Sequence, residues 1–296
     1  MKNIIVCFHN VKILNTFLNS FNLLKTFSTD QFKFYLIKDP RKQIDLSEIN
    51  VSQKLNYEIF TDDIYSYYLS RNNFSELAIK YIQSNLCNIS LVSSYYVRRE
   101  LKLDNVFYLD DDTVVLNDIS SLIGGKNLAY YMNKPLSYVF KNAKIQMQEF
   151  EEYSRITKTN LSNIYEHTDS RIKIAQYNAG HFNLIIDDFY LECLHRFFSS
   201  KVIATNFLKN KERGFWDEQR FLTHYFRCRP EQFIHAGNIT KNDSLVYLSY
   251  DENEFCNLSF EHFKFLFGNK LIIHYVGKLK LPRAAYFLNL ANTHKS

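Results

Sequence analysis

The stretch Phe107-Tyr108-Leu109-Asp110-Asp111-Asp112-Thr113-Val114-Val115 places three consecutive carboxylates directly after a short apolar segment. The apolar residues 106–109 are typical of a buried strand. Adjacent like charges repel, and carboxylates near a core are costly unless a cation neutralises them. Asp110 and Asp112 are therefore predicted to bind a divalent metal, which commonly serves a phosphate-bearing ligand. The alternative is a solvated acidic turn.

Strand-like and helix-like segments alternate on both sides of this stretch. Short apolar runs predict strands, and apolar residues at helical spacing predict helices. The predicted strands are 4–8, 32–37, 57–60, 106–109, 128–132, 181–186 and 271–275, and the predicted helices are 11–27, 74–103 (with a break near residue 88), 141–157, 188–202 and 216–227. This alternation indicates an α/β fold. In open α/β sheets ligands bind beyond the carboxyl ends of the strands, which is where the acidic triplet falls.

The composition fits one folded domain and excludes several classes of protein. The 296 residues suffice for a full core, and a hydrophobic content of 46% argues against disorder. The net charge of +5 is too small to indicate a nucleic-acid-binding protein. The five cysteines include no Cys-x-x-Cys pair, which argues against a disulfide framework or a structural zinc site. Apolar runs are too short for a signal peptide or a membrane span, so we expect a cytoplasmic protein.

A second candidate site lies in residues 271–280. His274 ends a predicted strand and is a candidate metal ligand. Gly277 allows close approach of the backbone to a ligand, and Lys280 supplies a point charge for phosphate. Taken singly, His274 would be an ordinary core histidine and Lys280 a solvated lysine. The spacing His-x-x-Gly-x-x-Lys, together with the acidic triplet, favours the functional interpretation.

Two further segments are weaker candidates. Asn178-Ala179-Gly180 precedes a predicted strand, where small residues make room and the Asn offers donors and acceptors. A simple turn entering the strand explains it equally well. Asp217-Glu218-Gln219 opens a predicted helix, where acidic residues ordinarily complement the helix dipole.

Taken in order, these segments resemble glycosyltransferase family 8 and its GT-A-fold relatives. That family has a strand ending in Asp-x-Asp, a Phe-Asn-Ala/Ser-Gly segment, Asp-Gln near a helix start and a final His-x-x-Gly-x-x-Lys. The matching segments here are Asp110-Asp111-Asp112, Tyr177-Asn178-Ala179-Gly180, Glu218-Gln219 and 274–280, and Ser94-Tyr95-Tyr96-Val97-Arg98 is similar to a segment whose Arg contacts the nucleotide-sugar. The resemblance implies a GT-A (Rossmann-like nucleotide-diphospho-sugar transferase) fold with a central mixed sheet flanked by helices. It implies a catalytic domain over residues 1–283 and a tail over 284–296.

The resemblance also implies an activity. The enzyme would move a hexose from a nucleotide-diphosphate sugar, expected to be a UDP-hexose, with retention of configuration. The acceptor would be a hydroxyl of a glycan, glycolipid or glycoprotein, as in polysaccharide or lipopolysaccharide biosynthesis. Asp110, Asp112 and His274 would bind Mn²⁺ or Mg²⁺.

Individual residues receive roles in the same way. Arg98 and Asp111 would position the donor sugar, and Gly277 and Lys280 would bind the diphosphate. The residues expected to contact the donor are Phe8, His9, Asn10, Arg98, Asp110, Asp111, Asp112, Asn178, Ala179, Gly180, His274, Gly277 and Lys280. The run Phe8-His9-Asn10 stands where the family commonly has Asp residues that contact uracil, so the base itself stays open.

Three residues are the catalytic candidates. Gln219 would stabilise an oxocarbenium-like state, and Glu218 and Asp217 are the carboxylates to test for a covalent route.

Two other functions fit parts of the sequence. In a haloacid-dehalogenase-type phosphatase, Asp110 would be the nucleophile and Asp112 the general acid/base, with Asp187-Asp188 as the later acidic pair. That motif normally ends the first strand of its domain, and it leaves residues 274–280 without a role. A non-catalytic sugar-binding protein is the other alternative, and retention of three candidate metal ligands argues against it.

The C-terminal stretch 278–288, which includes the start of the tail, mixes basic and apolar residues. We favour a packed C-terminal helix there. The alternative is peripheral contact with the inner face of an anionic membrane.

Overall fold

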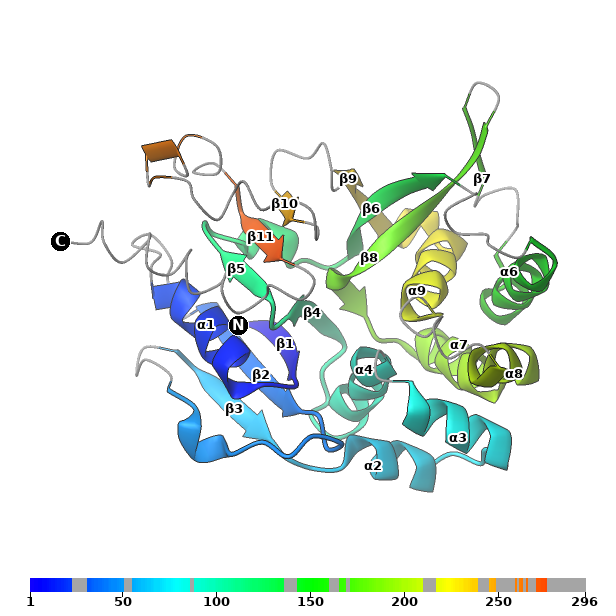
Figure 1. Ribbon diagram of the computed structural model, residues 1–296, viewed down its shortest axis with the longest axis horizontal. Helices are drawn as coiled ribbons and strands as arrows, with labels where there is room; N and C mark the ends of the chain where they lie inside the picture. Colours follow the sequence, from blue (N-terminus) through cyan, green and yellow to red (C-terminus); the bar gives the residue numbers. More distant parts are fainter. Residues whose placement is uncertain are drawn as a thin grey trace. The chain divides into compact units, whose positions relative to one another are not determined.

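The computed structural model describes residues 1–22, 31–50, 55–85, 88–135, 143–159, 165–168, 171–209, 217–238, 245–248, 259, 261–262, 265 and 270–275 (Figure 1). The chain divides into two compact units, each assembled from separate stretches. Unit 1 comprises Met1–Thr61, Phe107–Ile123 and Ile239–Ser296, and unit 2 comprises Asp62–Val106 and Gly124–Asn238. The catalytic domain expected over residues 1–283 stays a prediction.

Unit 1 is built on parallel strands in the order β3-β2-β1-β4. The strands are β1 (Lys2–Phe8), β2 (Phe32–Lys38), β3 (Tyr57–Phe60) and β4 (Asn105–Asp110). Strand β1 lies between β2 and β4, with Phe8 opposite Lys38 and Cys7 opposite Asp110. Strands β1, β2 and β4 are nearly continuous apolar runs because parallel sheets are buried on both faces. The carboxyl ends of these three strands therefore meet at one edge.

Helix α1 (Val11–Asn22) follows β1 directly. The Asn10 side chain caps it, because Oδ1 of Asn10 accepts from the backbone N of Lys12 at 2.8 Å and of Ile13 at 3.3 Å. The fully buried Leu14 and Leu18 of α1 are four residues apart and so share the face that turns inward. The helix contacts β1 and β5, and the polar segment between β1 and α1 is held at the strand edge.

Unit 1 also contains a small sheet in the order β10-β11-β5. Its strands are β5 (Thr113–Val115), β10 (Leu245–Leu248) and β11 (Ile272–Tyr275). Strand β11 runs antiparallel to β5, with His274 opposite Thr113. This register brings His274 beside the acidic triplet, although the two are far apart in sequence.

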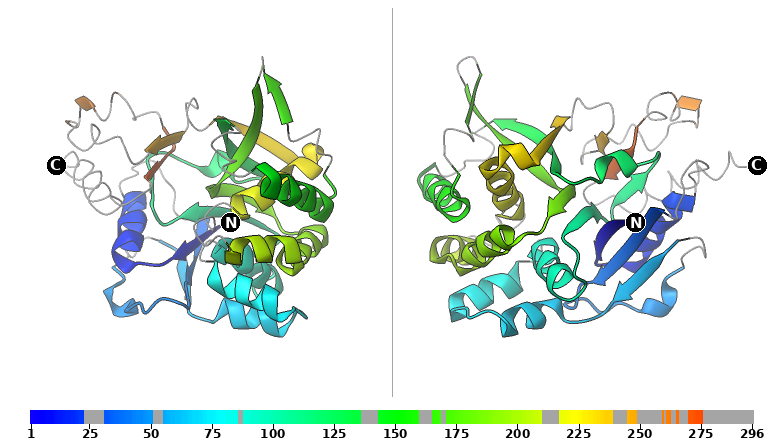
Figure 2. Two further views of the ribbon diagram at one scale, coloured as in Figure 1. Left: turned by 45° about the vertical axis from the view of Figure 1, so that its right-hand side comes forward. Right: turned by 180° about the vertical axis from the view of Figure 1, so that it is seen from behind.

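Unit 2 contains a mixed sheet. Its strands are β6 (Asn127–Pro135), β7 (Tyr165–Thr168), β8 (Arg171–Ile185) and β9 (Phe233–Asn238). Strand β8 is antiparallel to β6 and β7, and β6 is parallel to β9. The hairpin of β7 and β8 projects away from the helices of this unit in both views of Figure 2.

The helices of unit 2 pack through aromatic side chains. They are α2 (Ile64–Ser70), α3 (Glu76–Ser84), α4 (Ile89–Arg99), α6 (Ala143–Thr157), α7 (Asp188–Ser199), α8 (Lys201–Lys209) and α9 (Asp217–Cys228). The ring of Phe197 on α7 lies 4.8 Å from that of Phe221 on α9, and Tyr81 on α3 lies 5.1 Å from Phe207 on α8. Such pairs add to the stabilisation from apolar burial. Within the described ranges no helix has the length and apolar character needed to cross a membrane.

The predicted α/β fold, with a mixed sheet flanked by helices, is confirmed. Several boundaries differ from the prediction. The expected helix 74–103 is divided near residue 88, as predicted, into α3 and α4, whereas the expected helix 188–202 ends at Ser199 before a separate α8. Strand β8 begins ten residues before the predicted 181, and β5, β7, β9 and β10 were not predicted. Strands as short and polar as β7 (Tyr-Glu-His-Thr) carry no apolar alternation to reveal them.

Candidate functional site

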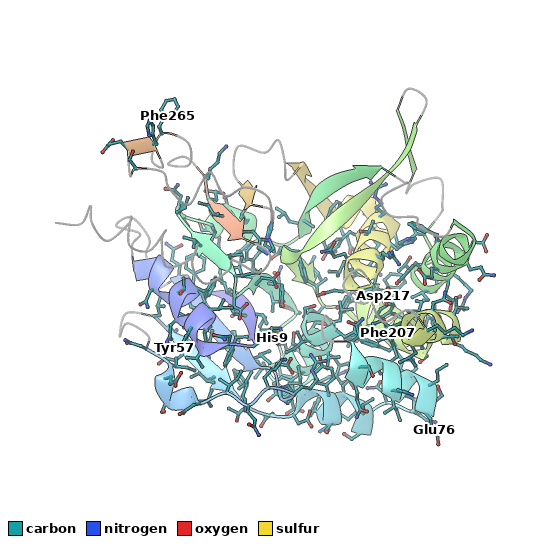
Figure 3. The ribbon with its side chains drawn as sticks, viewed as in Figure 1. His9, Tyr57, Glu76, Phe207, Asp217 and Phe265 are labelled. Carbon is teal, nitrogen blue, oxygen red and sulfur yellow. The ribbon has the colours of Figure 1, made fainter. Side chains whose placement is uncertain are left out.

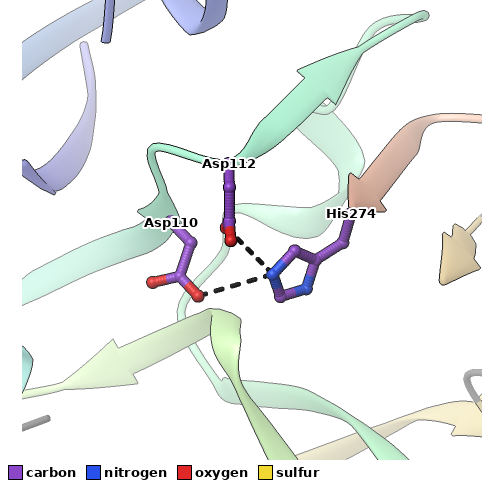
Figure 4. Close-up of side chains that lie close together, drawn as sticks. All are labelled: Asp110, Asp112 and His274. Atoms are coloured by element: carbon purple, nitrogen blue, oxygen red, sulfur yellow. Dashed lines mark ion pairs between the residues drawn. The ribbon is translucent and has the colours of Figure 1, made fainter. Parts of the chain in front are cut away.

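Asp110, Asp112 and His274, the metal cluster, converge in unit 1 (Figure 4). Nε2 of His274 lies 3.0 Å from Oδ1 of Asp112 and 3.6 Å from Oδ2 of Asp110. One ligand atom from each residue lies within 4.8 Å of the others. Asp112 and His274 are buried, whereas the Asp110 side chain is 35% exposed. The cluster is therefore open to a ligand on the Asp110 side.

Local structure explains why these three residues meet. Strand β4 ends at Asp110, and a tight turn leads into β5. Oγ1 of Thr113 donates to the backbone O of Asp110 at 2.8 Å and closes the turn. Pairing of Thr113 with His274 then sets the imidazole beside the turn. A strand end, a turn and a neighbouring strand thus fix the three ligand atoms.

The donor set suits a divalent cation. Two carboxylates and an imidazole offer oxygen and nitrogen ligands of the kind that Mn²⁺ accepts. Two carboxylates beside each other repel unless a positive charge lies between them, and imidazole carries charge only when protonated. A cation bound by these three atoms would balance the carboxylates and keep coordination positions for phosphate or water.

Asp111, expected to contact the donor sugar, is buried and turns toward the end of β1. Its Oδ2 accepts from the backbone N of His9 at 3.4 Å. Asp111 thus ties the segment after β1 to the acidic turn. The sugar contact stays a prediction.

The segment Phe8-His9-Asn10 lies at the same strand edge. The Phe8 side chain is completely buried in the core, and Asn10 caps α1. His9 is partly exposed, and its Nδ1 lies 2.9 Å from Oδ2 of Asp39. Nucleotide contact by these residues stays a prediction, and the geometry leaves His9 as the side chain best placed for it.

Sequence reasoning missed Asp39 and Arg41. Asp39 is completely buried and follows β2, and Nε and Nη2 of Arg41 donate to it at 2.8 and 3.0 Å. The sequence feature that could have identified them is the pair of charged residues just after the apolar strand β2. The acidic triplet likewise comes at the end of the apolar strand β4.

The remaining donor-contact candidates in unit 2 lie on α4 and β8. Arg98 is half-buried in the last turn of α4. Asn178-Ala179-Gly180 lies inside β8 and not in a turn before it, which corrects the turn interpretation. The turn was one of two alternatives, because the strand was predicted to begin only at residue 181. Strand β8 begins earlier, and its pairing with β6 shifts register between the pairs Tyr131–Tyr177 and Ala129–Phe182, so these residues lie at a bulge or irregularity within the strand. Gly180 is buried.

The catalytic candidates open α9. Asp217 and Glu218 are buried and Gln219 is partly exposed. Oδ2 of Asp217 accepts from the hydroxyl of Tyr81 at 3.2 Å, and Oδ1 accepts from that of Tyr153 at 3.3 Å. Asp217 is therefore held inside unit 2, and Gln219 is the more accessible of the three.

Asp217 belongs to a larger buried network, the tyrosine–acid cluster, whose members are Tyr81, Glu149, Tyr153, Asp217 and Arg220. Nη1 of Arg220 lies 2.9 Å from Oε2 of Glu149 and 3.8 Å from Oδ1 of Asp217. Burial raises the pKa of Asp217 to about 6, and Arg220 and the two hydroxyls offset that rise only in part. Of its members the sequence analysis singled out only Asp217, and it did not predict the cluster itself because the members come from α3, α6 and α9.

Gly277, Lys280 and the tail over 284–296 lie outside the described residues. Their predicted roles in diphosphate binding and in packing or membrane contact stay predictions.

No protein-family model and no curated protein matches the chain. Among solved structures, it is similar to the galactosyltransferase LgtC in complex with donor and acceptor sugar analogues (TM-score 0.44, 12% identity, 99% of this chain and 96% of that one). It is also similar to mouse xyloside xylosyltransferase 1 (TM-score 0.48, 13% identity, 92% and 97%).

A third similar structure is the bifunctional glycosyltransferase WbbM, of which this chain spans about half (TM-score 0.45, 12% identity, 100% and 52%). All three of these structures are of glycosyltransferases. Identity and TM-score are low in each case, so these similarities by themselves assign no function to this chain.

Proposed function

We propose that this protein is a metal-dependent glycosyltransferase that moves a hexose from a nucleotide-diphosphate sugar to a hydroxyl of a glycan or lipid-linked acceptor. The observation that carries the proposal is the convergence of Asp110, Asp112 and His274. Two carboxylates and an imidazole at the carboxyl end of a parallel strand form a site for a divalent cation and its phosphate ligand.

Each group of the cluster has a definable task. A divalent cation bound there would neutralise the charge that develops on a departing nucleoside diphosphate. Asp112 and His274, being buried, hold their ligand atoms in fixed positions. Asp110, at the open side, lies where the diphosphate would enter.

UDP-hexose as donor, Mn²⁺ as the ion and retention of configuration are further parts of the proposal that come from the family resemblance. Arg98 and Gln219 are the proposed contacts to the sugar and the reacting carbon. With Gln219 as the accessible residue of the α9 start, a front-face displacement assisted by the leaving phosphate is favoured over a covalent route through Asp217. The amide of Gln219 is a poor nucleophile, and Asp217 is held by two tyrosines.

The phosphatase alternative is less well supported. It uses Asp187 as part of a later acidic pair. Oδ1 of Asp187 accepts from the backbone N of Tyr190 at 2.7 Å as the cap of α7, and its Oδ2 pairs with Arg229. That carboxylate therefore has a structural role. Strand β4 is also not the first strand of its sheet.

The test is a screen of nucleotide-sugars with Mn²⁺ or Mg²⁺, with and without a chelator. We expect release of nucleoside diphosphate that needs the metal and stops with chelator. Release of phosphate from a phosphomonoester in place of this reaction would favour the phosphatase. Binding of sugar that is indifferent to metal and to Asp112→Asn would favour a non-catalytic binding protein.

A further inference from the structure

The tyrosine–acid cluster ties the start of α9 to two other helices of unit 2. Asp217 (labelled in Figure 3) is the first residue of α9, and its carboxylate accepts from Tyr81 of α3 and Tyr153 of α6. Arg220 follows one turn later on the same helix and donates to Glu149 of α6 at 2.9 Å. The first turn of α9 is therefore held at two points, one bonded to α3 and α6 and the other to α6 alone.

Hydrogen bonds add direction to the apolar packing of α9. Contacts between rings, such as that of Phe221 on α9 with Phe197 on α7 at 4.8 Å, bring the helices together, but apolar attraction is non-directional. A hydrogen bond requires a particular distance and angle. The first turn of a helix also lacks part of its backbone hydrogen bonds, so its side chains have a large share in fixing its position. The cluster therefore sets the rotation and the axial position of the first turn of α9.

Gln219 lies between the two anchored residues of α9 but on the other side of the helix. A helix turns by about 100° per residue, so a side chain two positions after Asp217 points about 200° away from it. Burial agrees with this, because Asp217 and Arg220 are buried whereas Gln219 is partly exposed. Oγ1 of Thr223 donates to the backbone O of Gln219 at 2.6 Å and bonds it to the following turn. Any rotation or shift of the first turn would therefore move Gln219 with it.

We propose that Tyr81 and Tyr153 are positioning residues that hold Gln219 at the reacting carbon. They act through the carboxylate of Asp217, which accepts from both hydroxyls. This inference rests on the proposed function, in which Gln219 contacts that carbon. A dipole stabilises developing charge only where its geometry is fixed in advance, and a displacement of about 1 Å can lower a rate about a hundredfold. Loss of the two hydroxyls should therefore lower turnover without weakening donor binding, which the metal cluster provides.

Phenylalanine variants test the proposal, because they remove only the hydroxyl groups. The ring of Tyr153 packs against those of Phe197 and His224, and the ring of Tyr81 against that of Phe207, and phenylalanine keeps these contacts. In Tyr81→Phe/Tyr153→Phe we expect kcat for metal-dependent nucleotide-sugar turnover to fall about 10- to 100-fold, with KM for the donor changed by less than about twofold. The melting temperature should fall by a few degrees, because a buried carboxylate loses two donors. Turnover is measured well below that temperature.

The matched control is Tyr225→Phe. Tyr225 is a buried tyrosine of the same helix, and its hydroxyl has no hydrogen-bond partner among the residues that the structure describes. We expect Tyr225→Phe to have the kcat and KM of wild type. A fall in kcat as large as that of Tyr81→Phe/Tyr153→Phe would show that loss of any buried hydroxyl near α9 has this effect, and would overturn the positioning role.

A double-mutant cycle with Gln219→Ala distinguishes positioning from a general effect on the fold. Gln219→Ala alone should lower kcat, and adding Tyr81→Phe/Tyr153→Phe should lower it little further, because the hydroxyls act through Gln219. Independent effects would instead multiply. Multiplying effects, or the kcat of wild type in Gln219→Ala or in the tyrosine double variant, overturn the positioning role and leave the proposed function standing. Absence of metal-dependent turnover in wild type overturns both.

Discussion

The metal cluster of unit 1 and the tyrosine–acid cluster of unit 2 each hold two carboxylates, but they balance the charge differently. In unit 2 a guanidinium lies between Glu149 and Asp217, and two tyrosine hydroxyls donate to Asp217. In unit 1 both carboxylates face an imidazole, and one of them is open to solvent. A carboxylate whose charge is balanced by a positively charged side chain of the protein serves to stabilise the fold. We expect acids grouped around an imidazole at a strand end to bind an ion that comes from outside, as proposed for the metal cluster.

The substitution Asp112→Asn in unit 1 should have the largest effect on activity. It tests whether Asp112 binds a metal or stabilises the fold. We expect kcat/KM for nucleotide-sugar turnover to fall by about 10³, because several kcal/mol of charge stabilisation would be lost with the metal. The melting temperature without metal should stay the same or rise, since one of two repelling charges is removed.

The matched control for that change is Asp104→Asn, which alters an exposed carboxylate just before β4. It should leave both activity and melting temperature unchanged. A large fall in the metal-free melting temperature of Asp112→Asn would mean that Asp112 is a structural acid like those of unit 2.

Arg220→Met should have the largest effect on stability. It would leave two buried carboxylates without their guanidinium, which costs about 3–5 kcal/mol when one partner of a buried pair is removed. The expected fall in melting temperature is about 10 °C for a chain of this size. The double variant Arg220→Met/Glu149→Gln removes one stranded charge and should be milder than the single variant.

Arg196→Ala is the control, because Arg196 pairs with Glu192 one helical turn away on the surface of α7. Such a pair contributes about 0.3–0.5 kcal/mol. If the Arg220→Met/Glu149→Gln double variant is less stable than the Arg220→Met single variant, an unbalanced buried carboxylate is not the cause of the lost stability.

The pH dependence of stability tests how far Arg220 balances the charge of the buried Asp217. Burial raises its pKa to about 6 in the folded state, above the value of an unfolded aspartate. Its contribution to stability is therefore present at low pH and is lost as pH rises from about 4 to about 6. The loss amounts to about 1–3 kcal/mol. Asp217→Asn should gain stability relative to wild type across that range, measured by urea unfolding at several pH values.

The exposed Asp188→Asn is the control for Asp217→Asn and should follow wild type at every pH. A constant difference between wild type and Asp217→Asn from pH 4 to 7 would show that Asp217 is ionised throughout, as expected of a carboxylate that Arg220 fully balances.

The metal cluster was predictable because its signals are local. Asp110 and Asp112 follow an apolar strand, and His274 ends another, so residue type and position after a strand were enough to identify them. The partnership of His9 with Asp39 was missed because it depends on the pairing of β1 with β2, which residue patterns do not specify. The tyrosine–acid cluster was missed for a similar reason. Tyr81 and Tyr153 stand at ordinary core positions of two helices, and only tertiary packing gives their hydroxyls a common acceptor.

Substitutions of Asn10 should have the smallest effect on stability. They distinguish a role of Asn10 in capping α1 from a role in binding the nucleotide. Asn10→Ala removes the cap of α1 and should cost about 1 kcal/mol, whereas Asn10→Ser keeps a capping oxygen and should restore most of it. If Asn10 also contacts the nucleotide, as the sequence predicts, Asn10→Ser will have normal stability and weaker UDP binding with Mn²⁺. If UDP affinity in Asn10→Ser equals that of wild type, the role of Asn10 ends with the helix cap, and His9 is left as the contact made from the β1 end.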